Sequence, residues 1–373
     1  MTVLLAATEL DVGYAERGGE PRTVLAGVSA RVGAGELICV LGPNGAGKST
    51  LLRTLAGMQE PLAGRVEVLG SPLASLRPRQ LARRIGVVLP ERVQSGMLTA
   101  AALVALGRHP YTDWLGRMQP EDEAKVRRAI QAVGAEHLAA RDVGNLSDGE
   151  RQKVMIARAL AQEPTVLILD EPTAFLDLPG RVEVMSLLLA LAREPAGGAG
   201  RAVLLSTHDL DLALRSADRV WLLDGRGRMA DGAPEDLVLR GDFQAAFERQ
   251  EVRYDPESGS FRIAAEPSGR VRLRGDGLAG RWTRRALERC GFAVDEGTGA
   301  EDEDIPSVAI DGEGTERAWR LSRRGGSSVH RSIEELLRAL RSDETPMQAP
   351  MQTICKSTGS MRREPLPRPT ARR

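Results

Sequence analysis

Residues 42–50 read GPNGAGKST, and they carry the most specific signal in the chain. They satisfy the pattern G-x-x-x-x-G-K-[ST], in which glycines let successive backbone N–H groups curl around phosphates. The apolar run 36–41 before them predicts a buried parallel strand, and residues 49–56 predict the start of a helix. Because a helix N-terminus adds partial positive charge beside such a loop, this context predicts a nucleoside triphosphate site rather than a chance turn.

The residues of this loop have separate expected roles. Lys48 would reach the β- and γ-phosphates, and the Ser49 hydroxyl would ligate magnesium. We expect the rest of the loop to line the nucleotide, and these residues are Gly42, Pro43, Asn44, Gly45, Ala46, Gly47 and Thr50.

Residues 166–171 read VLILDE, an apolar strand followed by two carboxylates. At the carboxyl end of a sheet, Asp170 is placed to hold magnesium, through water. Glu171 is then a candidate base that orients or deprotonates an attacking water molecule. Two acids at a strand end could be structural when taken alone, but the phosphate-binding loop favours the functional interpretation.

Composition limits the broad class of the protein. The formal net charge of the 373 residues is zero, so no global field favours nucleic acid. Three scattered cysteines without metal spacing are typical of a reducing cytosol. The N-terminus has no basic segment followed by a long apolar core, and the apolar stretch 182–192 is too short to span a membrane. We expect a soluble chain that reaches a membrane only through a partner.

Strands that alternate with helices predict a parallel α/β sheet. We expect a nucleotide-binding domain over residues 1–250, with an antiparallel β subdomain and a helical subdomain at about 92–162. Residues 251–343 predict a small α+β domain, and residues 344–373 a disordered tail.

Two helices are expected to form the core of the small domain. In the first, Trp282, Ala286 and Cys290 would share one apolar face. In the second, Leu336, Leu337 and Leu340 would supply the other.

Residues 146–150 read LSDGE and precede an apolar-periodic helix. Here the chain resembles the ATP-binding subunits of ABC transporters, whose signature is LSGGQ or LSGGE. The resemblance implies ATP and Mg²⁺ as cofactors, and it implies that Ser147 and Gly149 complete the ATP site of a second copy. Asp148 stands where the family usually has glycine, so its charge predicts slower hydrolysis or looser phosphate contact.

The resemblance assigns further residues in chain order. Tyr14 would stack on adenine, Asp177 lies in the loop that communicates across the dimer, and His208 would contact the γ-phosphate. Glu91 stands where the family has a glutamine that touches magnesium and the attacking water. Gln94 is the alternative occupant of that position if the loop is reshaped.

Residues 103–111, LVALGRHPY, together with residues 81–85, resemble importers of iron–siderophore, haem and cobalamin. That group implies a homodimer bound to integral permease subunits at the cytoplasmic face of the membrane. It also implies an extracytoplasmic substrate-binding protein and no nucleic acid.

Two other classes were considered. Soluble ABC ATPases of DNA repair or translation commonly carry two cassettes or a coiled-coil insertion, and this sequence has neither. A non-hydrolysing nucleotide sensor is suggested by Asp148 and Glu91, but the intact Glu171 and His208 favour an ATPase.

Overall fold

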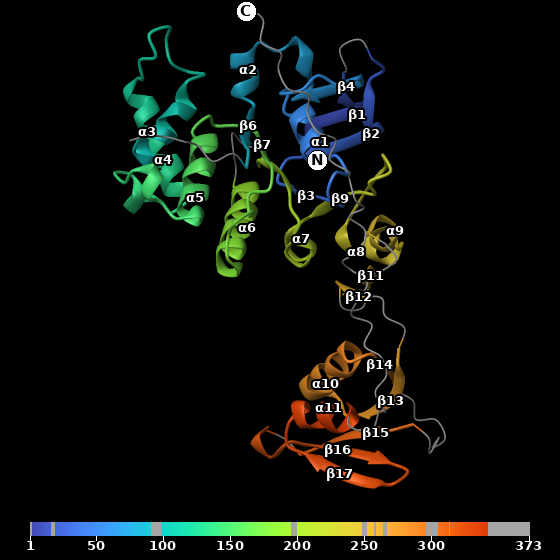
Figure 1. Cartoon of the computed structure of the whole chain (residues 1–373). Helices are drawn as coiled ribbons and strands as arrows, with labels where there is room; N and C mark the ends of the chain where they lie inside the picture. The colour runs from blue at the N-terminus through green and yellow to red at the C-terminus, as the bar shows by residue number, and fades with distance from the viewer. Residues whose placement is uncertain are drawn as a thin grey trace, which may run out of the picture. The chain divides into compact units, whose positions relative to one another are not determined.

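The structure is a computed structural model, and its contacts divide the chain into two compact units, Met1–Ala264 and Ala265–Arg373 (Figure 1). It describes residues 2–15, 19–90, 98–194, 200–247, 252–256, 259–263, 267–295, 305–312 and 314–341. The expected tail, residues 344–373, lies outside this described part, as do Glu91 and Gln94.

A six-stranded sheet with the order β10-β9-β3-β8-β7-β6 forms the centre of the first unit. Its five neighbouring strands from β6 to β9 run parallel, and β10 pairs antiparallel with β9 at the edge. The strands are β3 (Leu37–Leu41), β6 (Ile85–Val88), β7 (Val166–Leu169), β8 (Ala202–Ser206), β9 (Arg219–Leu223) and β10 (Met229–Gly232). Every residue of β3, β7 and β8 is buried, as expected for parallel strands covered on both faces.

A second, antiparallel sheet has the order β2-β1-β4-β5. Its strands are β1 (Val3–Tyr14), β2 (Arg22–Gly33), β4 (Ala63–Val68) and β5 (Ser71–Pro72). Helix α1 (Lys48–Leu55) packs Leu51, Leu52 and Leu55 into one buried cluster with residues of both sheets. The two sheets therefore share α1, the helix that follows the glycine-rich loop.

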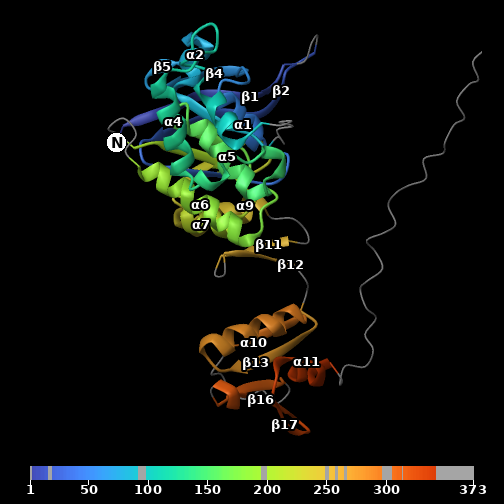
Figure 2. The same cartoon turned by 90° about the vertical axis from the view of Figure 1, so that its left-hand side faces the viewer.

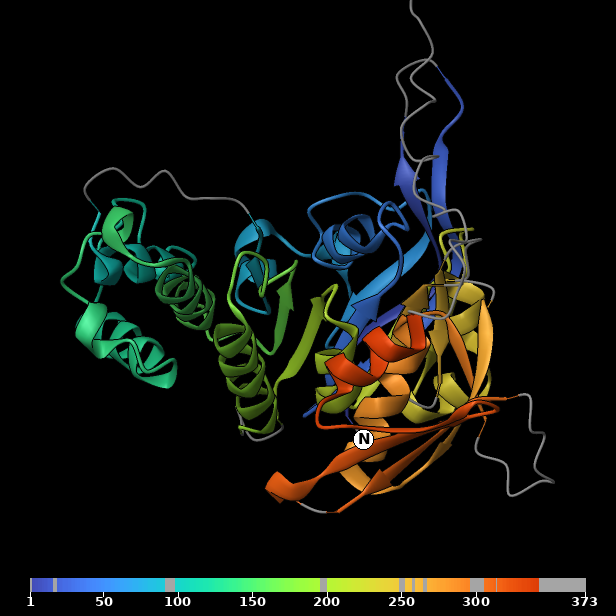
Figure 3. The ribbon, with the colours of Figure 1, turned by 60° about the horizontal axis from the view of Figure 1, so that its bottom comes forward.

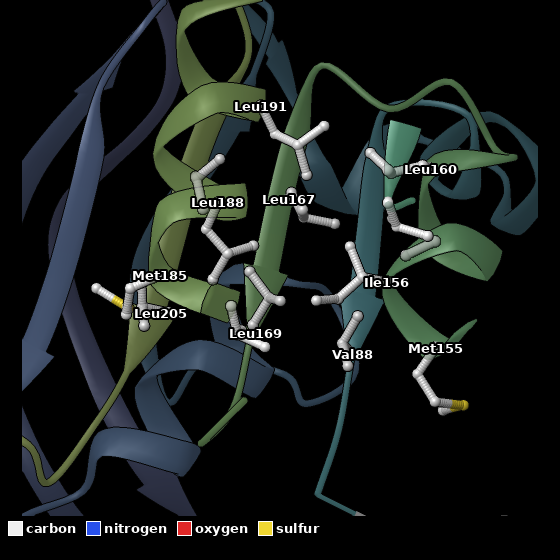
Figure 4. Packing of buried hydrophobic residues seen from close by; sticks show 14 of the residues in the cluster. Val88, Met155, Ile156, Leu160, Leu167, Leu169, Met185, Leu188, Leu191 and Leu205 are labelled. Atoms are coloured by element: carbon white, nitrogen blue, oxygen red, sulfur yellow. The ribbon is translucent and has the colours of Figure 1, made fainter. Parts of the chain in front are cut away.

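The helical part of the first unit stands to one side of the central sheet (Figure 3). Its helices are α3 (Ala100–Ala105), α4 (Pro120–Ala132) and α5 (Asp148–Leu160), with short 3₁₀ turns η2 (Leu106–Arg108), η3 (Glu136–Leu138) and η4 (Val143–Asn145). Helix α6 (Leu178–Arg193) and α5 cover the β6–β8 face of the sheet. Figure 4 shows their apolar side chains, Ile156, Leu160, Leu188 and Leu191, on either side of Leu167 of β7.

A buried arginine joins the helical elements. Arg108, which is 4% exposed, donates to Asp122 of α4 at 2.9 Å, to the Ala161 carbonyl at 2.7 Å and to Glu163 at 3.0 Å. Its guanidinium lies 3.8 Å from the centroid of the Tyr111 ring. The end of α3, the start of α4 and the end of α5 are thereby held together.

The first unit extends past the expected boundary at residue 250. It ends with α7 (Leu210–Ser216), α8 (Pro234–Leu239), α9 (Asp242–Phe247) and the hairpin β11 (Val252–Asp255)–β12 (Ser260–Ile263). Two short elements, η1 (Leu73–Ser75) and α2 (Pro78–Ala82), lie earlier in the same unit. Tyr254 of the hairpin is 5% exposed and stacks on Phe243 of α9 with ring centroids 5.3 Å apart. This packing attaches the hairpin to the first unit.

The second unit is a mixed sheet with the order β14-β13-β15-β16-β17, in which β13, β14 and β15 run parallel. Its elements are β13 (Gly269–Arg274), α10 (Gly277–Arg289), β14 (Phe292–Asp295), β15 (Ser307–Asp311), η5 (Gly314–Glu316), β16 (Ala318–Arg323), β17 (Gly326–His330) and α11 (Ile333–Arg341). Both helices lie on one face of the sheet (Figure 2). The parallel core, the antiparallel sheet, the helical part and this α+β unit confirm the predicted fold class.

The predicted inward face of α10 is confirmed at Ala286, which is 8% exposed, and is wrong at Trp282. Trp282 is 53% exposed and Cys290 is half-buried, whereas Thr283 and Leu287 are fully buried. The physical reason is a hydrogen bond, because Trp319 donates from Nε1 to the Thr283 hydroxyl at 2.8 Å and draws that side of the helix onto the sheet. In α11 the predicted face is confirmed, since Leu336, Leu337 and Leu340 are all buried.

Candidate functional site

The loop between β3 and α1 depends on glycine at two positions with positive φ. Gly42 has φ 147°, and a Cβ there would lie 2.5 Å from the Leu223 carbonyl oxygen. Gly47 has φ 101°, and a Cβ there would lie 2.5 Å from Cγ1 of Val24. The loop is therefore tight against its neighbours. Because α1 has no acidic residue in its first turn, its N-terminal N–H groups retain their attraction for an anion.

Lys48 lies over this loop. Its Nζ donates to the carbonyl oxygens of Gly42 at 2.9 Å and Pro43 at 3.1 Å. Burial lowers the pKa of Lys48, while the nearby carboxylates of Glu171 and Asp170 act in the opposite direction. The loop thus holds a cation beside the two acidic residues that follow β7.

Asp170 is the buried carboxylate of the site, at 2% exposure. Its Oδ1 accepts hydrogen bonds from the Ser49 hydroxyl at 3.0 Å and from the Ser206 hydroxyl at 2.7 Å. The oxygens at this point come from the ends of β7 and β8 and the start of α1. Oxygen donors with one carboxylate suit Mg²⁺, which is usually bound by one or two carboxylates together with phosphates and water. The Ser49–Asp170 pair therefore fits the ion.

Glu171 follows Asp170 with a left-handed backbone, φ 50°. Its backbone N–H donates to the Ser206 hydroxyl at 2.8 Å. Its Oε1 lies 2.7 Å from Nε2 of His208, so the ends of β7 and β8 bring these two predicted residues together. Ser206 is a site residue that sequence reasoning missed. The available signal was a hydroxyl residue that directly ends an apolar strand, two positions before the histidine.

Tyr14 lies close to the loop as well. It is 49% exposed, and its hydroxyl is 3.0 Å from Oγ1 of Thr50 on α1. The end of β1 thus brings an exposed aromatic ring to the start of the helix that follows the phosphate-binding loop.

The LSDGE segment begins α5. Ser147 is the N-cap: its hydroxyl accepts from the Glu150 N–H at 3.3 Å, and its own N–H donates to the Glu150 carboxylate at 2.8 Å. In the described part of the chain, the hydrogen bonds of Ser147 stay within this helix start. Gly149 follows in the first turn of α5. The structure therefore does not join Ser147 to the Lys48 loop of its own chain.

A cleft runs from this segment to the strand end that carries Glu171. Its lining residues are Leu89, Pro90, Asp148, Arg151, Gln152, Met155, Glu171, Ala174 and Phe175. Asp177, two residues after Phe175, is the N-cap of α6 and accepts from the Gly180 N–H at 3.0 Å. The other predicted site residue, Glu91, lies outside the described residues.

Comparison with known proteins agrees with this arrangement. The family model described as ABC transporter matches residues 25–174, and the one described as iron ABC transporter C-terminal domain matches residues 268–341. An ABC transporter ATP-binding protein of Methanocaldococcus jannaschii is 41% identical over 264 residues, which are 71% of this chain and 88% of that protein.

Two further relatives carry functional names. The ferric enterobactin transport ATP-binding protein FepC of Escherichia coli is 37% identical over 63% of this chain and 83% of that protein. The cobalamin import ATP-binding protein BtuD of Halobacterium salinarum is 42% identical over 65% of this chain and 60% of that protein. Among solved structures, a dimeric ATP-binding cassette in a post-hydrolysis state with ADP and Pi has a TM-score of 0.53 and 28% identity, covering 62% of this chain and 99% of that one.

A glycine-rich loop, a lysine and two strand-end acids on a parallel sheet define a P-loop ATPase of the cassette type. The chain belongs to the family of ABC transporter ATP-binding proteins. In the part of the chain that the structure describes, no helix is long and apolar enough to cross a membrane.

Proposed function

We propose that this chain is the ATP-hydrolysing subunit of an ABC importer for a metal chelate of the iron–siderophore, haem or cobalamin type. The observation that carries the hydrolytic part is the meeting of Lys48, Asp170, Glu171 and His208 at the ends of three neighbouring parallel strands. The import part is supported by relatives named for ferric enterobactin and cobalamin, and by the iron ABC transporter C-terminal domain.

In the proposed mechanism each side chain acts on the triphosphate or on water. Lys48 and the loop N–H groups bind the phosphates, and Tyr14 stacks on adenine. Glu171 takes a proton from the attacking water, and His208 contacts the γ-phosphate while its bond to Glu171 orients that carboxylate. Mg²⁺, held by Ser49 and Asp170 and by Glu91, would neutralise phosphate charge.

The remaining roles require a second copy of the chain. Ser147 and Gly149 would bind the γ-phosphate held by the partner copy, since they stand at the start of α5 and are exposed and half-buried, respectively. Asp177 would lie at the contact between the two copies. Dimer closure on ATP would move permease subunits at the cytoplasmic face of the membrane, and an extracytoplasmic protein would deliver the chelate.

Replacement of the base tests the hydrolytic part. Glu171→Gln should lower kcat for ATP by about 10²–10⁴, the usual worth of a general base, and should leave ATP binding intact. It should also accumulate an ATP-dependent dimer, visible by size-exclusion chromatography, because closure no longer leads to hydrolysis.

Two control variants, one expected to lose ATP binding and one expected to keep full activity, accompany this experiment. Lys48→Ala should lose ATP binding itself, whereas Glu67→Gln, which removes a surface carboxylate on β4, should keep full turnover. A kcat of Glu171→Gln within a few-fold of the unaltered chain would remove Glu171 from the role of base. Co-purification of the chain with an integral membrane permease tests the transport part.

A further inference from the structure

Asp148 is the off-pattern residue of the signature segment, residues 146–150, and Arg151 holds it from one turn along α5. Nη1 of Arg151 donates to Asp148 Oδ1 at 2.7 Å, and Nη2 donates to the Leu146 carbonyl oxygen at 2.8 Å. One guanidinium therefore ties the extra carboxylate to its own helix and to the backbone at the start of the segment.

A second arginine repeats the arrangement on the next acid. Arg141 donates from Nη1 to Glu150 Oε1 at 2.8 Å and from Nη2 to the Asn145 carbonyl oxygen at 2.9 Å. Both carboxylates of the segment thus face a guanidinium that also holds a backbone carbonyl. Ser147, which precedes both acids, keeps its capping geometry, and each acid has a cation of its own.

The charge on Asp148 has two opposite effects. A carboxylate in the first turn of a helix is favoured by the helix dipole, but it repels any phosphate brought to the same N–H groups. The side chain of Arg151 is 23% exposed and that of Asp148 43%, so the guanidinium is the more enclosed member of the pair. The charge of the Asp148 carboxylate is therefore balanced by the Arg151 guanidinium on the same helix.

From this geometry we infer that Arg151 is a positioning residue for the ATP site of the partner copy. It neutralises Asp148 and keeps its carboxylate on α5, so that the segment accepts a γ-phosphate although glycine is replaced by an acid. This inference rests on the proposed function, in which Ser147 and Gly149 serve the second copy.

The test is a double-mutant cycle on the full chain. Arg151→Gln should raise KM for ATP roughly 3- to 10-fold, the scale of one charge interaction near a protein surface, with a smaller change in kcat. Asp148→Asn in the Arg151→Gln background should restore KM toward that of the unaltered chain, because no carboxylate is then left to neutralise. Lys153→Gln, which removes another cation of α5, one paired with Glu183 of α6, should leave KM within about twofold.

Different outcomes would overturn the role of Arg151 and the proposed function. If KM of the double variant stays as high as that of Arg151→Gln, Arg151 acts only through the Leu146 carbonyl and the inference is overturned. An unchanged KM in Arg151→Gln overturns it too. Binding of a fluorescent ATP analogue that depends on Lys48 tests the proposed function itself, and its absence in the unaltered chain would overturn that function whatever Arg151 does. Far-UV circular dichroism confirms folding of each variant.

Discussion

A single hydroxyl group on Ser206 supports both acidic residues at the end of β7. It donates to Asp170 at 2.7 Å and accepts from the Glu171 N–H at 2.8 Å, and the residue is fully buried. Strand β8 therefore positions the carboxylates that β7 carries. Because Ser206 bonds to both of these residues, its effect on turnover is expected to act through them.

Ser206→Ala should lower the free energy of unfolding by about 1–3 kcal/mol, because two buried polar groups each lose a partner. It should also lower kcat by about tenfold, the lower end of the loss seen when support for a metal-binding carboxylate is removed. Urea unfolding and an ATPase assay measure the two effects. Ser186→Ala, an exposed serine on α6, is the matched control and should change unfolding by less than about 0.5 kcal/mol. Equal behaviour of the two variants would refute the supporting role.

Single residues with a strong local motif could be predicted from the sequence, and those defined by tertiary packing could not. Lys48, Ser49 and Asp170 stand in a fixed pattern relative to a strand and a helix, so their convergence follows from the order of the parallel strands. Ser206 contributes through a contact between two strands that lie far apart along the chain. The sequence shows a hydroxyl residue at the end of an apolar strand, but it does not indicate which carboxylate that residue contacts.

At the scale of elements, Arg108 links α3, α4 and the end of α5 from a nearly solvent-free position. Its partner Asp122 is equally buried, with side-chain exposures of 5% and 7% for the pair. The Gln119 backbone N–H and the Arg108 guanidinium hold the pKa of Asp122 below its usual range, although burial acts against them. The pair therefore stays charged inside the helical part.

Arg108→Ala should cost about 3–5 kcal/mol of unfolding free energy, because it leaves the Asp122 carboxylate buried without its cation. Urea unfolding followed by far-UV circular dichroism measures the loss. Arg128→Ala removes an exposed arginine from the same helix as Asp122 and should have an effect of less than about 0.5 kcal/mol. If Arg108→Ala unfolds at the same urea concentration as that control, the ion pair does not stabilise the helical part.

Elements were predictable where hydrophobic periodicity was strong. Strand β7 has the predicted bounds, because a short apolar run there is followed directly by two charged residues. Strand β17 reads GSSVH and is mostly exposed, so its sequence has no apolar alternation to indicate a strand. The inward face of α10 was wrong at Trp282 because Thr283 is paired with Trp319 in the core, and apolarity alone cannot identify a polar residue as buried.

At the scale of the whole molecule, the boundary between the two compact units differs from the boundary expected from sequence composition. The composition of the sequence changes near residue 250, but the hairpin β11–β12 belongs to the first unit, because Tyr254 stacks on Phe243. Sequence could predict two folded units from their separate runs of elements. The exact join depends on aromatic packing between α9 and the hairpin, which composition does not show.

A chain ending at Ala264 should bind ATP with the affinity of the full chain, because every described phosphate-site residue lies before residue 210. A chain ending at Glu251 should bind ATP too but unfold at a lower temperature, since Phe243 loses the Tyr254 ring. Differential scanning fluorimetry with and without ATP compares the two. Identical melting temperatures would show that the hairpin adds nothing to the first unit, and loss of ATP binding in both would overturn the independence of that unit.

At residue 171 the left-handed backbone favours glycine for stability, whereas the proposed role in turnover requires a carboxylate. A non-glycine residue there costs roughly 1–2 kcal/mol, so glycine should be the most stable occupant although it has no carboxylate. The free energy of unfolding of Glu171→Gly should therefore exceed that of Glu171→Ala by about 1 kcal/mol. Within regular structure the order is usually the reverse, because alanine is then the more stable of the two residues. Under the proposed function, the carboxylate at this position is therefore kept at a cost in stability.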